Sequence, residues 1–423
     1  MRPRMCGRAL WRMRTGLISA ALAVLIASAG VPAQSQQFKM LYQFQCAQDG
    51  CNPYGPLARD PSGNLYGSAP GSDGASGSGD IYEFSSHGQF SVLHEFTGVG
   101  GDGGGPVGVV LAGNALYGAT AFGGYTNYGT VFKLSKAGEK ILYRFTGPPA
   151  DGEFAESSVI LDNSRNIYGT TAVGGDGACD GGVVSCGTVY MVTPGGKESI
   201  LHSFTGAPDG QEPMQPLTVD ASGALYGTTY YGGQSACGSD PFGCGVVFKL
   251  TPAEDGTWNE SVLYRFTGGT DGEFPSSALT VDAEGNIYGT TNAGGDLSGC
   301  EGGGCGTIFK ISKAGQFSVL YSFTGEADGA NPDGNLLLDA HGNLYGTAGG
   351  GGNTTCPYGC GNIFKLTPSG HLVVLHTFNS IQGDTPAGGQ IFDDRGTLYG
   401  VTIYGGNGPC GGGCGTIYKF SLK

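Results

Sequence analysis

One segment of roughly 50 residues recurs along almost the whole chain and restricts the folds open to it. In residues 262–311 it reads VLYRFTGGTDGEFPSSALTVDAEGNIYGTTNAGGDLSGCEGGGCGTIFKI. Its landmarks are LYRF, an Asp-Gly turn, an apolar run ending in Asp, NIYGTT, a loop rich in Gly and Cys, and GTIFKI. These landmarks occur seven times. A period of this length is typical of solenoids and propellers.

Four short runs in each repeat are typical of β-strands. Runs such as 278–282 and 307–311 are rich in β-branched and aromatic residues and are bounded by Gly, Asn or Asp. Helical periodicity is missing after the N-terminal segment. The sequence therefore predicts an all-β fold, a seven-bladed β-propeller whose blades are four-stranded antiparallel sheets.

The offset of the repeats predicts how the ring closes. Residues 38–44 copy the outermost strand before any innermost strand has occurred, and residues 416–420 form a third strand without a fourth. The N-terminal strand can therefore complete the last blade. An open solenoid would need polar capping repeats instead. We expect residues 34–423 to form one closed propeller domain.

The first 33 residues have the pattern of a secretory signal peptide. Five Arg residues precede an apolar run at 17–29, and Val31-Pro32-Ala33 offers small residues before a cleavage site. The run is short for a membrane span, and no second apolar run follows it. We therefore expect an exported, unanchored monomer that is secreted or periplasmic.

The composition restricts the partners of the exported chain. Without the five Arg residues of the signal, 16 basic residues remain against 35 acidic ones, a net charge of −19. An acidic surface disfavours nucleic acid and anionic membranes, so neither is expected as a partner. The 83 Gly residues follow no Gly-X-Y period and indicate many tight turns.

The loop between the second and third strand of each repeat is the part that varies in length. From Tyr117 to Lys133 there are 16 residues, whereas from Tyr226 to Lys249 there are 23. Surface loops tolerate such variation and often carry function. This loop is therefore the expected working part of each repeat.

Twelve cysteines follow Cys6, which lies in the predicted signal, and they form six local pairs. The pairs are Cys46 with Cys51, Cys179 with Cys186, Cys237 with Cys244, Cys300 with Cys305, Cys356 with Cys360, and Cys410 with Cys414. Five of them lie in the longer versions of the variable loop. Local disulfides, each contributing roughly 2 kcal/mol, would persist in an exported protein. Zinc is the alternative, but it needs four ligands and the pairs lie on different blades.

Eight aromatic residues in or next to the variable loops do not follow the repeat strictly. They are Phe122, Tyr125, Tyr128, Tyr230, Tyr231, Phe242, Tyr358 and Tyr404. Clustered on one face, they can stack on sugar rings or hold a protein partner. The alternative is local packing against the disulfides and the Gly-rich backbone. If they bind, replacing Tyr125 and Tyr231 by Ala should weaken glycan or partner binding without unfolding the protein.

An Asp beside a Gly follows the outer strand of every repeat, and five of these Asp residues are weak candidates for a metal site. They are Asp102, Asp151, Asp209, Asp271 and Asp328. A ring of carboxylates can hold Ca²⁺, which prefers oxygen ligands. The recurrence favours the alternative, in which each Asp accepts hydrogen bonds from its own turn. No metal or other cofactor is therefore expected.

The histidines indicate no catalytic site. His94, His202 and His376 occupy the Tyr position of the outer-strand motif, so they are variants of the repeat. No Ser-His-Asp set or cluster of His residues is implied, although distant residues can converge in a ring. No catalytic residue is assigned.

The repeat resembles the Gloeo/Verruco (GloVer) tandem repeat of exported bacterial proteins. The resemblance is carried by residues 266–275, 282–295 and 306–311, and it extends over the chain that follows the signal. It implies export and a repeat scaffold, often with a C-terminal anchoring domain of the choice-of-anchor type. We expect no such domain after Lys423. The first repeat departs most, at residues 68–70 and 80–83.

These observations favour a binding scaffold over an enzyme. Its working face would carry the Cys/Gly-rich loops, and its partner would be a glycan or an extracytoplasmic protein. One alternative is an enzyme centred on the channel, a lyase or lactonase with or without Ca²⁺, by analogy with other propellers. A purely structural role in the cell envelope is the second alternative.

Overall fold

The computed structural model describes residues 37–422, except 47–48, 72–77, 178, 180–184, 235–236 and 238–240. The signal peptide predicted for residues 1–33 lies outside this range. Gln36–Lys423 forms one compact unit. The regular structure of the described residues is β-strand, with one 3₁₀ turn, η1 (Cys300–Gly302). None of their helices is long and apolar enough to cross a membrane.

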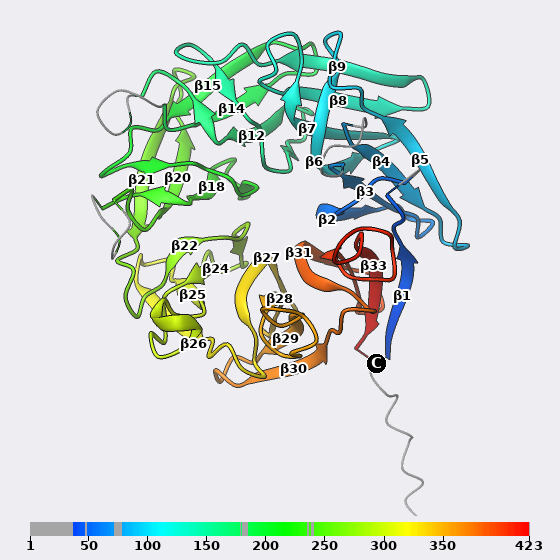
Figure 1. Cartoon of the computed structure of the whole chain (residues 1–423). Coiled ribbons are helices and arrows are strands. Elements are labelled where there is room, and N and C mark those ends of the chain that lie inside the picture. Colours follow the sequence, from blue (N-terminus) through cyan, green and yellow to red (C-terminus); the bar gives the residue numbers. More distant parts are fainter. Residues whose placement is uncertain are drawn as a thin grey trace, which may run out of the picture. The chain divides into compact units, whose positions relative to one another are not determined.

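The antiparallel sheets form seven blades around a central axis, as Figure 1 shows, and this confirms the predicted seven-bladed β-propeller. Blades 1 and 2 contain β2 (Tyr54–Arg59), β3 (Leu65–Ala69), β4 (Asp80–Phe84), β5 (Phe90–Glu95), β6 (Gly103–Ala112), β7 (Ala115–Gly123), β8 (Thr130–Ser135) and β9 (Gly138–Arg144). Blade 3 contains β10 (Gly152–Glu153), β11 (Ile160–Leu161), β12 (Ile167–Thr171), β13 (Val173–Gly174), β14 (Thr188–Val192) and β15 (Glu198–Ser203).

Blades 4 to 7 repeat this arrangement. Blade 4 contains β16 (Gly210–Gln211), β17 (Thr218–Val219), β18 (Leu225–Thr229), β19 (Tyr231–Gly232), β20 (Val246–Pro252) and β21 (Trp258–Arg265). Blade 5 contains β22 (Glu273–Pro275), β23 (Thr280–Val281), β24 (Ile287–Ala293), β25 (Thr307–Ile311) and β26 (Phe317–Ser322). Blade 6 contains β27 (Ala330–Leu338), β28 (Leu344–Gly350), β29 (Asn362–Leu366) and β30 (Leu372–Thr377). Blade 7 contains β31 (Asp384–Phe392), β32 (Thr397–Tyr404), β33 (Thr416–Ser421) and β1 (Gln37–Gln43).

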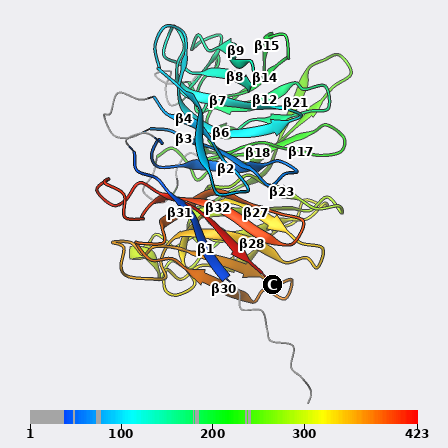
Figure 2. The same cartoon turned by 90° about the vertical axis from the view of Figure 1, so that its right-hand side faces the viewer.

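The ring closes between the two ends of the described chain. Strand β1 pairs antiparallel with β33, with Phe38 opposite Phe420 and Gln43 opposite Thr416. Blade 7 therefore takes three strands from the C-terminal part of the chain and its outermost strand from the N-terminal part (Figure 2). This confirms the closure predicted from the offset of the repeats.

A ring of aromatic pairs packs each blade against the next. The Phe that ends each outer-strand motif is almost fully buried, and it contacts an aromatic residue on the third strand of the next blade. The seven pairs have ring centroids 5.0–5.3 Å apart in tilted to edge-on geometry. The Gly of the Tyr-Gly motif makes room for them, because a Cβ on Gly289 would lie 2.6 Å from the Phe309 ring.

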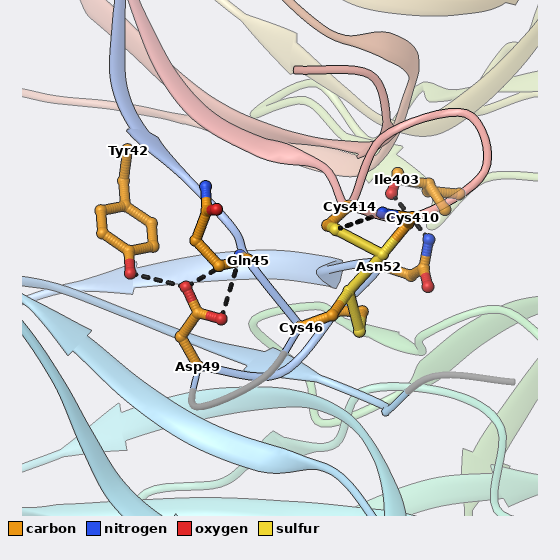
Figure 3. Close-up of a disulfide and its surroundings, with 9 residues drawn as sticks. Tyr42, Gln45, Cys46, Asp49, Asn52, Ile403, Cys410 and Cys414 are labelled. Atoms are coloured by element: carbon orange, nitrogen blue, oxygen red, sulfur yellow. Dashed lines mark hydrogen bonds between the residues drawn. A yellow bond between two sulfur atoms is a disulfide. The ribbon is translucent and has the colours of Figure 1, made fainter. Parts of the chain in front are cut away.

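The cysteines pair within their loops as the sequence predicts, and the ring adds a further contact. All six local pairs are present: Cys46 with Cys51, Cys179 with Cys186, Cys237 with Cys244, Cys300 with Cys305, Cys356 with Cys360, and Cys410 with Cys414. Cys46 also lies within bonding distance of Cys410, as Figure 3 shows. The reason is the closure of the ring, which places the segment after β1 beside the variable loop of blade 7. Since a sulfur forms one disulfide at a time, the Cys46–Cys51 and Cys46–Cys410 bonds are alternatives.

The second cysteine of each loop pair departs from the surface position expected for the variable loops. It is fully buried in all five blades, at Cys186, Cys244, Cys305, Cys360 and Cys414. Each of these sulfurs belongs to the same hydrophobic cluster as the outer-strand Phe of its own blade, as Cys305 does with Phe323. The cysteine stands two residues before the third strand, so the chain has already returned to the sheet there. The disulfides therefore fasten the loops to the core of the ring.

Candidate functional site

A hollow of about 400 Å³ opens where the first residues of the innermost strands surround the channel. Its lining includes Tyr54, Glu156, Gln215 and Asp333. A smaller hollow of about 120 Å³ shares Tyr54, Glu156 and Gln215 and adds Ser158 and other residues of the strands. The two hollows thus share part of their polar lining.

The backbone at the start of each innermost strand has the same shape in all seven blades. One residue there has a positive φ of 51–63°, namely Asn52, Gly105, Phe154, Glu212, Phe274, Asn331 or Thr385. In the first six, the backbone N–H donates to a carbonyl oxygen of the preceding blade at 2.6–3.1 Å. The next residue is Pro in every blade but the third. These contacts hold each innermost strand against the preceding blade.

The residue two positions after the positive φ lines the 400 Å³ hollow in blades 1 to 6 and is followed by an irregularity of the strand. In blade 1, for example, the register with β3 shifts between Tyr54 and Ala58. Bulges of this kind redirect side chains and often occur beside functional sites. In blades 3 to 5 the innermost strand is interrupted at this point. The seven residues at this position, which we call the channel ring, are Tyr54, Val107, Glu156, Met214, Ser276, Asp333 and Ala387.

Burial perturbs the acidic groups of the channel ring. It raises the pKa of Asp333 to about 6, although Gly334 N–H donates to Oδ1 at 2.7 Å and opposes the rise. Burial also raises the pKa of Glu156. The pKa of the Tyr54 phenol is raised first by the charge of Asp333, then by burial and by the charge of Glu156. The two carboxylates and the phenol therefore share one electrostatic environment.

Two of the aromatic residues singled out in the sequence line this hollow. Phe122 lies over the backbone of Gly104 and is 37% exposed. Tyr230 stacks on Phe274, with ring centroids 4.8 Å apart and planes 7° apart. The hollow thus has aromatic surfaces together with the carboxylates of Glu156 and Asp333.

The sequence matches the profile of the Gloeobacter/Verrucomicrobia repeat over residues 30–179, 87–301 and 241–423. These spans overlap and together include almost the whole chain. The chain belongs to this family. The resemblance drawn from the repeat motifs is thereby confirmed. No curated protein matches the sequence.

Solved structures with TM-scores above 0.5 share the fold of this Gloeobacter/Verrucomicrobia repeat protein at low sequence identity. One is PorZ, a surface component of the type-IX secretion system of Porphyromonas gingivalis, with 13% identity, a TM-score of 0.52, and coverage of 89% of this chain and 47% of PorZ. Another is the extracellular domain of a one component system from B. thetaiotaomicron, with 9% identity, a TM-score of 0.51 and coverage of 91% and 40%. A gluconolactonase from Xanthomonas campestris has 13% identity, a TM-score of 0.44 and coverage of 92% and 90%. This chain spans less than half of the first two proteins.

The other six aromatic residues do not line the 400 Å³ hollow of the repeat protein. Tyr231 packs edge-on against Tyr230 with centroids 4.9 Å apart, and Phe242 lies 5.7 Å from Tyr231. Tyr128 packs into the hydrophobic core. The remaining three are exposed elsewhere: Tyr125 and Tyr358 on loops, and Tyr404 at the end of β32.

The repeated Asp residues accept hydrogen bonds close to where they stand in sequence. Asp271 accepts from the Tyr264 hydroxyl at 2.9 Å and from both the N–H and the hydroxyl of Thr267. Asp151 and Asp328 repeat this pattern with their own Tyr and Thr. Asp102 and Asp209 bond to the corresponding Thr and lie beside a His in the Tyr position. This is the local bonding that the sequence offered as the alternative to a Ca²⁺ ring.

Sequence reasoning missed the channel ring, although a signal for it was present. In six blades the ring residue stands five positions after the repeated Asp, as Tyr54 follows Asp49 and Asp333 follows Asp328. That Asp recurs in these six blades and a Pro stands directly before the ring residue in six of the seven, whereas the ring residue itself differs between blades. A position that varies inside an otherwise regular repeat is not fixed by packing between blades. This variation could have indicated a functional position in the channel.

Proposed function

We propose that this exported propeller is a scaffold that binds a saccharide at the 400 Å³ hollow of the channel. The observation that carries the proposal is the presence of Phe122 and Tyr230 beside Glu156, Gln215 and Asp333 in one lining. Ligand sites combine apolar, often aromatic surface with a few polar groups that fix orientation. A sugar ring offers both a C–H face and hydroxyl groups to such a lining.

The charge of the lining narrows the class of saccharide. Among the described residues that line the two hollows, none is Lys, Arg or His. The carboxylates of Glu156 and Asp333 accept hydrogen bonds from hydroxyl or ammonium groups and repel anions. The ligand is therefore a neutral or amino sugar, and uronates and sulfated glycans are excluded.

The cysteines support a place outside the cytoplasm. Disulfides persist in oxidising compartments and are rare in the cytosol. Six local pairs in one chain, together with the signal peptide predicted for residues 1–33, favour export. The N-terminal sequence of the protein recovered from the periplasm or the medium tests this. A protein that begins at Met1 and stays in the cytoplasm would contradict export.

Binding is tested with a panel of neutral, amino and uronate oligosaccharides by calorimetry. Neutral or deacetylated chito-oligosaccharides are expected to bind and oligogalacturonate is not. Phe122→Ala and Glu156→Gln should each weaken binding about tenfold, the effect of losing one stacking or hydrogen-bonding contact of about 1.4 kcal/mol. Tyr358→Ala is the matched control, because that side chain is 91% exposed and does not line the hollow.

Two results would contradict the proposal. One is the absence of binding by any member of the panel. The other is binding that Tyr358→Ala weakens as much as Phe122→Ala does. Melting temperatures of all variants should equal that of the wild type within a few degrees, so that lost affinity is not lost folding.

The alternative is a channel-centred lyase or lactonase. Carboxyl groups with raised pKa values beside a phenol are typical of catalytic acids and bases, which is the observation in its favour. An enzyme of this kind must stabilise a developing anion, and the described lining supplies no cationic side chain for it. Neutral donors of the lining, such as Gln215 and Asn292, or an added Ca²⁺ ion would have to take that role. Heat on titrating Ca²⁺ into the chelated protein, with product release from the same panel, would favour the enzyme.

A further inference from the structure

The outer edges of the blades meet through one recurring contact, in which three junctions differ from the other four. The Tyr or His of each outer-strand motif faces the residue near the start of the next blade's outer strand. Four of these facing residues are apolar: Phe38, Phe90, Phe317 and Leu372. At the other three junctions the same position holds Glu139, Glu198 or Glu260.

Glutamate at this position leaves a buried oxygen without a partner. The Oε1 atoms of Glu139, Glu198 and Glu260 are buried and accept no hydrogen bond within the described part of the chain. Where Phe317 stands instead, it stacks on Tyr264 with ring centroids 3.7 Å apart. A buried carboxylate oxygen without a partner is costly, so three such sites call for a compensating group.

At the junction of blades 1 and 2, three ligand atoms converge. One ligand atom each of His94, Asp102 and Glu139 lies within 4.8 Å of the others. His94 Nε2 is buried and without a hydrogen bond in the described chain, as is Glu139 Oε1. His94 Nε2 and Asp102 Oδ1 are 3.9 Å apart. Ligand atoms at zinc bond lengths lie roughly 3.3–3.5 Å apart in a tetrahedral site, so a small side-chain rotation suffices.

Neighbouring groups already hold two of these side chains in place. Asp102 accepts hydrogen bonds from the Thr97 N–H and hydroxyl and from the Gly103 N–H, each at 2.8 Å. The His94 ring packs edge-on against Phe96 with centroids 4.6 Å apart. Such outer contacts orient the ligands of metal sites. The charges of Asp102 and Glu139 exceed that of the nearby Arg144, which favours a cation.

We propose that His94, Asp102 and Glu139 bind a divalent transition-metal ion such as Zn²⁺ and thereby link the outer edges of blades 1 and 2. One imidazole and two carboxylates form a three-ligand set of the kind that Zn²⁺ accepts, with water completing the coordination. The site lies at the rim and is separate from the channel. The test of metal binding is therefore independent of the test of saccharide binding.

The junction of blades 3 and 4 is a natural comparison inside the same molecule. It contains the same residue types, His202, Asp209 and Glu260. There His202 Nε2 is already 3.1 Å from Asp209 Oδ2, within hydrogen-bond distance. No convergence of three ligand atoms is found at this junction among the described residues. We therefore expect no comparable affinity for metal there.

The experiment is a calorimetric titration of Zn²⁺ into the oxidised, tag-free full chain after treatment with EDTA. Saturable binding of one ion is expected, together with a Zn²⁺-dependent rise in melting temperature. His94→Tyr and Glu139→Leu should each lower the affinity at least tenfold. Both substitutions use residues that the chain itself has at equivalent positions, so folding should survive. A Co²⁺ spectrum that requires His94 provides a second readout.

His202→Tyr is the matched control and should leave the affinity unchanged. Three outcomes would overturn the proposal: the wild type does not bind saturably, His94→Tyr binds as tightly as the wild type, or His202→Tyr removes binding equally. Oxidation keeps the paired cysteines from competing for the ion, and the dependence of binding on His94 distinguishes the proposed site from the unpaired Cys6.

Discussion

The start of each innermost strand is alike in all blades, whereas the channel ring two residues later has a different residue in each. At the start, the positive φ recurs in all seven blades and a Pro follows it in six. In the channel ring no two blades have the same residue. The start contacts the neighbouring blade, and every blade has the same kind of neighbour. The ring residue instead faces the channel, where identity is not required by packing.

This difference shows at which positions of the repeat the residue type can change without disturbing the packing of the blades. Gly306 packs against Pro332 of the next blade, and Gly245 packs in the same way against Pro275. A change there would disturb a contact that the whole ring depends on. A change at Asp333 alters the channel and leaves those contacts in place. Scaffold and site are therefore separated by only a few residues of sequence.

The largest loss of stability is expected from Gly306→Ala, which disturbs the contact between blades at the start of an innermost strand. Gly306 has a φ of +95°, and its added Cβ would lie 2.6 Å from Pro332 Cδ. Backbone strain and overpacking together should lower the free energy of unfolding by about 3 kcal/mol. Chemical denaturation measures this.

Gly315→Ala separates strain from overpacking in that experiment. Gly315 has a similar φ of +80°, but nothing lies within 4 Å of its added Cβ. Its loss should be only about 1 kcal/mol, the cost of a left-handed residue. The added Cβ of Gly306 would also crowd the carbonyl oxygen of Thr291 in its own blade, so equal losses at Gly306 and Gly315 would show that overpacking at this position contributes little.

An intermediate effect is expected from Glu198→Leu, which gives the junction of blades 2 and 3 an apolar residue like Leu372. Burial, and then the charge of Asp151, raise the pKa of Glu198 to about 7 from an ordinary 4.5. The folded state therefore binds the proton more tightly, and ionisation of Glu198 lowers stability as pH rises from 4.5 to 7. The variant should gain about 1 kcal/mol above pH 7 and almost none below pH 4.5.

The comparison of unfolding at pH 4 and pH 8 tests this, with Glu198→Gln as the control for charge alone. The glutamine variant should also become less dependent on pH, but with a smaller gain because it buries an amide. A gain for the leucine variant that is the same at both pH values would contradict the assigned ionisation.

The smallest effect on stability is expected from Asp333→Asn, which changes the channel ring. Burial raises the pKa of Asp333 to about 6 from 3.8, so its ionisation lowers stability as pH rises through that interval. The variant should gain about 0.5 kcal/mol at pH 8, because the asparagine amide is buried in place of the charge and is itself costly there, and nothing at pH 3. Saccharide affinity should fall in the same variant. A loss of stability at pH 8 would place Asp333 in the scaffold.

Sequence patterns predicted the fold in detail and the site in part. The Tyr-Gly motif and the Phe of the outer strand have fixed spacings because both contact the same third-strand aromatic residue: Gly289 makes room for Phe309, and Phe266 of the preceding blade packs against it. The aromatic residues were harder to place. Phe122 and Tyr230 line the hollow, but Tyr128 packs in the core. Exposure depends on the path of each loop, and loop length alone does not specify that path.

The cysteines also show that sequence spacing predicts local contacts but not burial or contacts between distant segments. Their spacing in sequence predicted which of them pair, because partners a few residues apart meet within one loop. It did not predict that the second member of each loop pair is buried, as at Cys186, Cys305, Cys360 and Cys414. Nor did it predict that Cys46 meets Cys410, because that contact requires the closed ring.

The sequence by itself determined the number of blades, the order of their strands and the closure by residues 38–44, because each of these follows from local patterns repeated at regular intervals. Only the tertiary structure decided which side chains face the channel and which meet at the rim. Glu156 and Asp333 share an environment, and His94 faces Glu139, because the ring curves back on itself and places separate repeats together. Local sequence patterns specify the strands of one blade, whereas contacts between side chains of different blades depend on how the blades pack.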